Sequence, residues 1–277
     1  MKKLTANLLA IMAFSLASSC LSTRAVTYDL ALDFSTNANP NGVWSYGYTS
    51  TLGGSLNLYD ESGDSSGLLF WRHNLALGAP SVVWNSTTNT IQGGTPVIGP
   101  GAAAFHPGPN GQFSLFRFAA PANDSYRLES SFFGSDTYGT STDVHVLLND
   151  AVIFDGSVNG FGPTSGPAFN TNLMLQAGDQ VDFAVGFGNG SFYYDTTGIS
   201  ARLVSETPTL SIAFTAPETV VITWPSPSTN WQLQQNTDSL SSANWSDVTD
   251  TIQDDGKTKS LIVNPTAGDR FYRLRKP

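Results

Sequence analysis

The chain has 277 residues, of which 40% are hydrophobic, 12% aromatic and only 13% charged. This apolar fraction is sufficient for a buried core and excludes a disordered chain. The formal net charge of −9 excludes nucleic acid and anionic membranes as favoured partners, whereas neutral glycans, cations and basic proteins remain compatible. Low charge together with 26 glycines and 15 prolines favours an all-β extracellular protein with many turns.

Residues 1–25 have the pattern of an export signal peptide. Lysines near the start precede a short apolar stretch, which is too short to span a bilayer as a helix. We place cleavage after Ala25, so the mature chain is expected to have no transmembrane segment and to be secreted, periplasmic or at the cell surface. In the alternative, a bacterial lipobox ends at Cys20, and a lipid on this cysteine anchors the chain.

Residues 26–205 alternate short strand-like segments with turns rich in Gly, Pro and Asn, which predicts a jelly-roll-like β-sandwich. The clearest strand follows the turn at residues 39–42. Trp44, Tyr46 and Tyr48 fall at every second position there, so they share one face of the strand. The other face is small and mostly polar and cannot build a core, so we expect the aromatic face to point inward.

Residues 206–209 (Glu-Thr-Pro-Thr) are predicted to be a linker, and residues 210–277 a second, smaller β domain. Apolar residues alternate in this second region, as in Ile222 and Trp224, and a final strand is expected at residues 271–274. About seven strands are expected here, as in immunoglobulin-like and fibronectin III-like sandwiches. The predicted fold class is therefore all-β, with a jelly-roll-like sandwich followed by a small immunoglobulin-like or fibronectin III-like sandwich.

A family resemblance extends over residues 30–204. It is carried by residues 33–35, 39–47, 105–108, 126, 177–183 and 195–198. These segments resemble a family of secreted, mostly uncharacterised bacterial proteins known from Verrucomicrobia and Planctomycetes. The overall pattern is similar to jelly-roll carbohydrate-binding modules, which implies a glycan-binding role. Residues 210–277 resemble fibronectin III-like modules through Trp224, Trp231, Leu233, Trp245 and residues 271–274.

Two tryptophans with polar neighbours are the predicted ligand-binding residues. Trp71 is followed by Arg72 and Asn74, and Trp84 is followed by Asn85. Aromatic rings stack on the C–H faces of sugars, and polar side chains at strand ends can bond the sugar hydroxyls. In the alternative, both indoles cap the core, because Trp is usually highly buried.

A third aromatic group precedes a carboxylate near the end of the same region. Phe192, Tyr193 and Tyr194 stand directly before Asp195. The same combination of rings and a polar neighbour at a strand end marks these residues as a further glycan-binding candidate.

Asp33, Asp195 and Thr196 are predicted to hold a structural calcium ion. Asp33 follows the first strand and Asp195 precedes the last, and these two strands lie close together in many sandwiches. Calcium takes six to eight oxygen ligands from carboxylates and carbonyl groups. In the alternative, both aspartates cap turns by accepting hydrogen bonds from nearby backbone N–H groups.

The sequence contains no catalytic motif of the nucleophile-elbow, P-loop or dinucleotide-binding type, and nothing selects a pair of catalytic carboxylates. We therefore expect a non-catalytic protein that binds a polysaccharide or an envelope glycan. One alternative is a structural or adhesive envelope protein whose C-terminal domain docks a protein partner. Another is a glycoside hydrolase.

Overall fold

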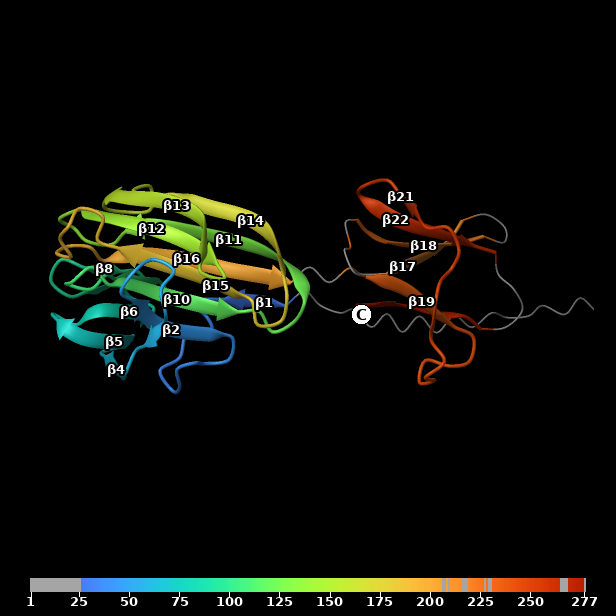
Figure 1. Ribbon diagram of the computed structural model, residues 1–277, viewed down its shortest axis with the longest axis horizontal. Helices are drawn as coiled ribbons and strands as arrows, with labels where there is room; N and C mark the ends of the chain where they lie inside the picture. The colour runs from blue at the N-terminus through green and yellow to red at the C-terminus, as the bar shows by residue number, and fades with distance from the viewer. Residues whose placement is uncertain are drawn as a thin grey trace, which may run out of the picture. The chain divides into compact units, whose positions relative to one another are not determined.

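The computed structural model describes residues 26–205, 208, 210–215, 219–226, 228, 231–264 and 269–276. The predicted signal peptide and most of the predicted linker lie outside these residues. The chain forms an N-terminal unit that ends at Thr207 and a C-terminal unit that begins at Pro208. Every secondary-structure element in the described residues is a β-strand (Figure 1). No described helix has the length and apolarity needed to cross a membrane.

The N-terminal unit consists of two antiparallel sheets that face each other. The first contains, in order, β14 (Ala168–Leu175), β11 (Asp124–Gly134), β16 (Thr197–Ser205), β9 (Ala103–His106), β6 (Ala79–Asn85), β5 (Leu68–Ala76) and β4 (Glu61–Ser65), and β1 (Thr27–Asp29) also pairs with β16. The second contains β13 (Ala151–Gly160), β12 (Thr140–Leu148), β15 (Gln180–Gly186), β10 (Phe113–Ala119), β2 (Trp44–Thr49) and β3 (Asn57–Leu58). From β9 onward, the chain passes repeatedly from one sheet to the other, as in a jelly roll.

The aromatic face of β2 contributes to the core between these sheets. Trp44 and Tyr46 are 1% and 0% exposed, which confirms the inward orientation predicted for them. Tyr48 is only half-buried and stacks on Tyr59, with ring centroids 5.9 Å apart. Gly47, which lies between Tyr46 and Tyr48 in the sequence, permits the close approach of β3. A Cβ atom at this position would lie only 2.3 Å from the Asn57 carbonyl oxygen.

The C-terminal unit is a smaller antiparallel sandwich. One sheet contains β17 (Ser211–Phe214), β18 (Val220–Pro225), β22 (Thr258–Val263) and β21 (Gln253–Asp254), and the other contains β20 (Ser246–Asp247), β19 (Gln232–Asn236) and β23 (Phe271–Arg275). Its core joins Ile222, Trp224 and Leu261 of the first sheet to Leu233 of the second. The predicted all-β fold, with a jelly-roll-like sandwich followed by a smaller β-sandwich, is therefore confirmed.

A two-stranded hairpin, β7 (Ile91–Gln92) and β8 (Val97–Ile98), projects from the long connection between β6 and β9. The connection is anchored by the hairpin's contacts with the β11–β12 turn, where the Val97 N–H donates to the Ser135 carbonyl oxygen (2.8 Å). The hairpin therefore belongs to one end of the N-terminal sandwich (Figure 1).

Candidate functional site

Three connections, β9–β10, β11–β12 and β15–β16, meet at that end of the N-terminal sandwich. The Ser135 N–H donates to the carbonyl oxygen of Thr196 (2.9 Å), which ties the second connection to the third. The Phe192 ring meets the His106 ring edge-on at a centroid distance of 5.9 Å, which ties the third to the end of β9. Sandwich loops that are fixed in this way are common positions for binding sites.

Three exposed tyrosines gather on these loops, and we call Tyr138, Tyr193 and Tyr194 the tyrosine platform. Their exposed fractions are 74%, 58% and 48%. The rings of Tyr138 and Tyr194 stack, with centroids 4.9 Å apart and planes inclined by 29°, and Tyr193 lies 6.5 Å from Tyr194. The buried Phe192 supports Tyr193 from below at 4.6 Å. Aromatic side chains from two distant parts of the sequence thus form one exposed surface.

The β11–β12 turn fixes the position of Tyr138. One carboxylate oxygen of the buried Asp136 accepts a hydrogen bond from the Tyr138 backbone N–H (3.1 Å). The other oxygen accepts from the Thr95 hydroxyl (2.8 Å), and the Thr137 N–H donates to the Thr95 carbonyl oxygen (3.0 Å). The turn is therefore fastened both internally and to the hairpin, so Tyr138 is held before any ligand arrives.

The β15–β16 connection fixes Tyr194 in an unusual backbone conformation. Its φ of 66° lies in the left-handed region, which costs a bulky residue about 1 kcal/mol or more. The next residue, Asp195, is completely buried and accepts a hydrogen bond from the Ser141 N–H (3.1 Å). The Thr197 hydroxyl donates to the Asp195 carbonyl oxygen (3.2 Å). Such strain persists only where the surroundings determine the conformation, and it often marks binding sites.

Asp195 itself lies in an unfavourable environment for a charge. Its second carboxylate oxygen is buried and has no hydrogen-bond partner among the described residues. Burial is the main reason that the pKa of Asp195 is raised to about 7. The hydrogen bonding from Ser141 opposes this shift, and the neighbouring charges of Asp136 and Asp143 contribute to it. The carboxyl group beneath the platform is therefore neutral in mildly acidic solution and ionised in alkaline solution.

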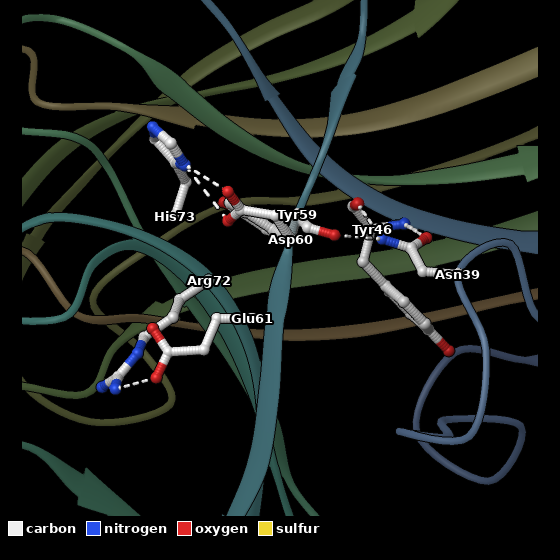
Figure 2. A network of polar contacts seen from close by, with 7 residues as sticks. All are labelled: Asn39, Tyr46, Tyr59, Asp60, Glu61, Arg72 and His73. Atoms are coloured by element: carbon white, nitrogen blue, oxygen red, sulfur yellow. Dashed lines mark hydrogen bonds and ion pairs between the residues drawn. The ribbon is translucent and has the colours of Figure 1, made fainter.

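Trp71, one of the two predicted ligand-binding indoles, belongs to the core. It is 9% exposed, lies nearly parallel to the Tyr46 ring at 6.4 Å, and donates its indole N–H to the Ser35 carbonyl oxygen (2.8 Å). The prediction that it presents its ring to a ligand is wrong, and the alternative of a core position describes it correctly. Side chains alternate along β5, so Arg72 points away from the core and pairs with Glu61 (Figure 2).

The remaining residue of that predicted group, Asn74, fastens a hairpin. Its side-chain oxygen accepts a hydrogen bond from the Gly78 N–H (3.0 Å) at the β5–β6 turn. The structure therefore does not bring Trp71, Arg72 and Asn74 together on one surface. Trp71 packs towards β2, whereas Arg72 pairs with β4 and Asn74 fastens the β5–β6 turn.

Figure 2 shows the polar contacts around Arg72 and the start of β4. The Asn39 amide donates to the Tyr46 carbonyl oxygen (2.7 Å), and its side-chain oxygen accepts from the Tyr46 N–H (2.9 Å). A longer bond runs from Asn39 to the Tyr59 carbonyl oxygen (3.4 Å), and His73 contacts Asp60 at 3.1 Å. The Asn39 contacts hold the turn before β2 against its neighbours, and the His73–Asp60 contact joins β5 to the residue before β4. The role of both is to fix local structure.

Asn85 is also a structural residue, contrary to its predicted role in ligand binding. It is completely buried, and its amide group donates to the carbonyl oxygens of Asn89 (2.8 Å) and Ile98 (2.9 Å). Its side-chain oxygen accepts from the Thr87 N–H (2.9 Å). The neighbouring Trp84 is half-buried, and its indole N–H donates to the carbonyl oxygen of Gly101 (3.1 Å). Both residues organise the long β6–β9 connection.

The structure separates the predicted calcium ligands Asp33 and Asp195. The Asp33 carboxylate accepts from the Asp29 N–H (3.0 Å), and Asp29 pairs with Arg202 in β16. Asp195 lies seven residues before Arg202, which corresponds to about 23 Å along an extended strand. The prediction that one calcium ion joins these two carboxylates is therefore wrong. Asp33 instead caps a turn, which was the alternative prediction for it. The carbonyl oxygen of Thr196 accepts from the Thr140 hydroxyl (2.9 Å).

Within the described ranges, no group of three or more His, Cys, Asp and Glu side chains is placed to hold a metal ion. Residues 192–194 were predicted from the sequence as glycan-binding candidates, whereas Tyr138 was not. An aromatic residue directly before glycine in the Asp-Thr-Tyr-Gly turn was the available signal. Its partner Tyr194 is far away in the sequence, so only the fold reveals their contact.

No family model and no curated protein matches the sequence. In structure, the chain is similar to a family 51 carbohydrate-binding module from Clostridium perfringens GH95 in complex with methyl-galactose, with a TM-score of 0.31, 12% identity, and coverage of 64% of this chain and 99% of that one. It is also similar to a family 35 carbohydrate-binding module from Clostridium thermocellum, with a TM-score of 0.27, 14% identity, and coverage of 65% and 98%. These low sequence identities and TM-scores assign neither a ligand nor a role to this chain, so both depend on its own side chains.

Proposed function

We propose that the protein is a secreted, non-catalytic glycan-binding protein that holds a neutral polysaccharide on the tyrosine platform. The observation that carries the proposal is the stack of Tyr138 and Tyr194, which two separately fastened loops present to solvent. Exposed groups of large apolar side chains on a monomer usually mark a binding surface. Tyrosine is well suited to glycans, because its ring can contact the C–H groups of a sugar and its hydroxyl can bond the sugar hydroxyls.

The polar groups around the platform support a neutral ligand. Thr137, Asn189 and Ser191 are exposed on the same two connections as the tyrosines. The Thr137 hydroxyl already donates to the Thr95 carbonyl oxygen, and the Asn189 amide donates to the Ser141 hydroxyl. A ligand would therefore use the hydroxyl lone pairs and the second amide hydrogen. The carboxylates of Asp136 and Asp195 are buried beneath the surface. The exposed chemistry is therefore that of uncharged hydrogen-bond donors and acceptors, which match the hydroxyl groups of a neutral sugar.

Affinity electrophoresis of residues 26–277 on a panel of neutral polysaccharides tests the proposal. We expect retardation by at least one of them, and the substitution Tyr194→Ala to weaken binding about tenfold, because it removes one ring from the stack. The matched control is Phe214→Ala, which removes an exposed aromatic ring from β17 of the C-terminal unit. The absence of retardation on every neutral polysaccharide of the panel would contradict the proposal.

Secretion is part of this proposal and rests on the predicted signal peptide. Export with cleavage after Ala25 would give a mature chain that begins at Val26. A lipoprotein would instead begin at a lipid-modified Cys20. The intact mass of the protein recovered from the producing cells distinguishes the two, and recovery of an uncleaved chain from the cytoplasm would argue against both.

A second candidate function is that of a structural or adhesive envelope protein with no small ligand. It is favoured by the exposed apolar side chains Ile212, Phe214 and Ile262 on the four-stranded sheet of the C-terminal unit. Such side chains suit contact with a protein partner. Chemical cross-linking in envelope preparations, compared between the wild type and Phe214→Ala, tests this candidate. A defined adduct that the variant loses supports it, and identical patterns contradict it.

A further inference from the structure

Four strands stand at the ends of the two sheets of the N-terminal unit, and three of them carry a feature that opposes pairing with another chain. β3 has only two residues, and β4 carries the charged side chains of Glu61 and Asp64. β13 contains a bulge, since its register with β12 shifts between Val146 and Leu147. Short length, charged side chains and bulges are the usual ways in which edge strands avoid adding a further strand.

β14, the fourth of these strands, has none of these features. Its sequence, Ala-Phe-Asn-Thr-Asn-Leu-Met-Leu, contains no charged residue, proline or glycine. Its pairing with β11 runs from Ala168 to Leu175 without a shift in register, and no other described strand pairs with it (Figure 1). β14 is thus an uninterrupted strand of eight residues that is open along one edge.

The backbone groups along the open edge belong to Ala168, Asn170, Asn172 and Met174. The Phe132 N–H donates to the Pro167 carbonyl oxygen (2.9 Å), which shows that odd-numbered residues of this segment face β11. Backbone groups alternate in direction along an antiparallel strand, so the even-numbered residues face outward. Their side chains are also exposed. Each of them presents an N–H and a C=O group that a further strand can bond.

The sequence of β14 is complementary to itself in the antiparallel direction. In one register, Thr171 lies opposite Thr171 of a second copy. Asn170 then lies opposite Asn172, so amide groups meet on one face of the joined sheet. Phe169 lies opposite Leu173, so an aromatic ring meets an aliphatic side chain on the other face. This register also places the outward-facing residues in hydrogen-bonded pairs, as an added antiparallel strand requires.

We propose that β14 is a self-association edge, through which two copies of the chain form a dimer about a two-fold axis at Thr171. Two-fold dimers bring the same surface of both subunits together, so a strand that matches itself suits this interface. The first sheets of the two copies then form one continuous sheet. A foreign peptide can bond the same backbone groups, but it does not account for the match of β14 with itself.

Self-association gives the protein two tyrosine platforms. Ala168 pairs with Ser131 near the end of β11, so β14 begins at the end of the sandwich that carries the platform. Because the paired strands run in opposite directions, the two platforms lie at opposite ends of the dimer. One dimer can therefore join two polysaccharide chains. This consequence rests on the proposed function, whereas the pairing of β14 does not.

Sedimentation equilibrium of residues 26–277 over a range of protein concentrations tests the proposal. At physiological ionic strength, charge repulsion is screened beyond about 8 Å, and we expect a reversible equilibrium between monomer and dimer. The double substitution Asn170→Lys, Asn172→Lys places like charges opposite each other and should weaken dimerisation about tenfold. The matched control is Ser62→Lys, Ser65→Lys, which adds the same charge to exposed positions of β4 at the other end of the sheet and should leave dimerisation unchanged.

A single cysteine tests the register directly, because the one cysteine of the chain, Cys20, precedes residues 26–277. The substitution Thr171→Cys places two thiols at the two-fold axis. The Cα atoms of a non-hydrogen-bonded pair lie about 4.5 Å apart there, within the range that a disulfide spans. Mild oxidation should therefore link this variant into a covalent dimer, whereas Ser62→Cys should remain monomeric.

Three results would overturn the proposal: a wild type that is monomeric at every concentration, a dimer that the β14 lysines leave unchanged, or a Thr171→Cys variant that cross-links no faster than Ser62→Cys. Glycan binding by the chain with lysines in β14 would leave the proposed function intact, because the platform is not altered. The two claims therefore fail separately.

Discussion

The buried carboxyl group of Asp195 makes the stability of the N-terminal unit depend on pH. The substitution Asp195→Asn preserves the shape of the side chain. It also preserves the hydrogen bond from the Ser141 N–H, because only one side-chain oxygen accepts that bond (3.1 Å). It replaces the buried oxygen that has no described partner and removes the charge. We expect the variant to lose the pH dependence that Asp195 gives to the wild type.

The magnitude follows from the pKa of about 7 in the folded protein and the ordinary value of 3.8. Because the folded-state pKa is the higher one, ionisation of Asp195 opposes folding. Its cost is absent below about pH 4, grows as pH rises, and is complete above about pH 7. One pKa unit corresponds to about 1.4 kcal/mol, so the free energy of unfolding should fall by about 2.5 kcal/mol between pH 5 and pH 8.

Urea unfolding at pH 5 and pH 8 measures this difference. The N-terminal transition should be followed separately, because two units need not unfold together. The control is Asp64→Asn, which neutralises an exposed carboxylate in the β4–β5 hairpin and should keep the wild-type profile. The reasoning would be refuted if the wild type were equally stable at both pH values, or if Asp195→Asn kept the same decrease.

Three further substitutions test individual contacts in the N-terminal unit. Burial lowers the pKa of His145, but its hydrogen bonds with Asp143 (2.8 Å) and Asp155 (2.6 Å) raise the pKa by more. The protonated ring therefore stabilises the fold at low pH, and this stabilisation is lost as pH rises through the raised pKa. The substitution His145→Gln should remove this pH-dependent loss in urea unfolding. Asn85→Ala should lower the unfolding free energy by about 3 kcal/mol, measured the same way, because it leaves buried carbonyl groups unpaired. Trp71→Phe should lower the melting temperature yet leave glycan binding unchanged.

The sequence allowed a correct prediction of fold class because the relevant signals are local. The alternation of Trp44 and Tyr46 identifies a strand and its inward face, and the turn before it identifies where the strand starts. The division into two β units likewise follows from patterns that repeat over a few residues. These features require no knowledge of which strands become neighbours.

The proposed binding site could not be predicted in the same way. Trp71 and Trp84 have similar polar neighbours, but the depth of each indole depends on strands that are distant in sequence. Tyr138 and Tyr194 become one surface only because two loops end at the same end of the sandwich. Asp33 and Asp195 were expected to meet because they flank the first and last strands, but β16 is long enough to keep them apart.

The affinity of the platform for a neutral polysaccharide is the central measurement. Residues 26–277 and the variant Tyr138→Ala, Tyr194→Ala should be titrated with the polysaccharide that retards the wild type most. We expect the variant to bind at least about tenfold more weakly, with an unchanged melting temperature, because both stacked rings are exposed and contribute little to the core. Equal affinity of the two proteins would contradict the assignment of the platform as the glycan-binding site.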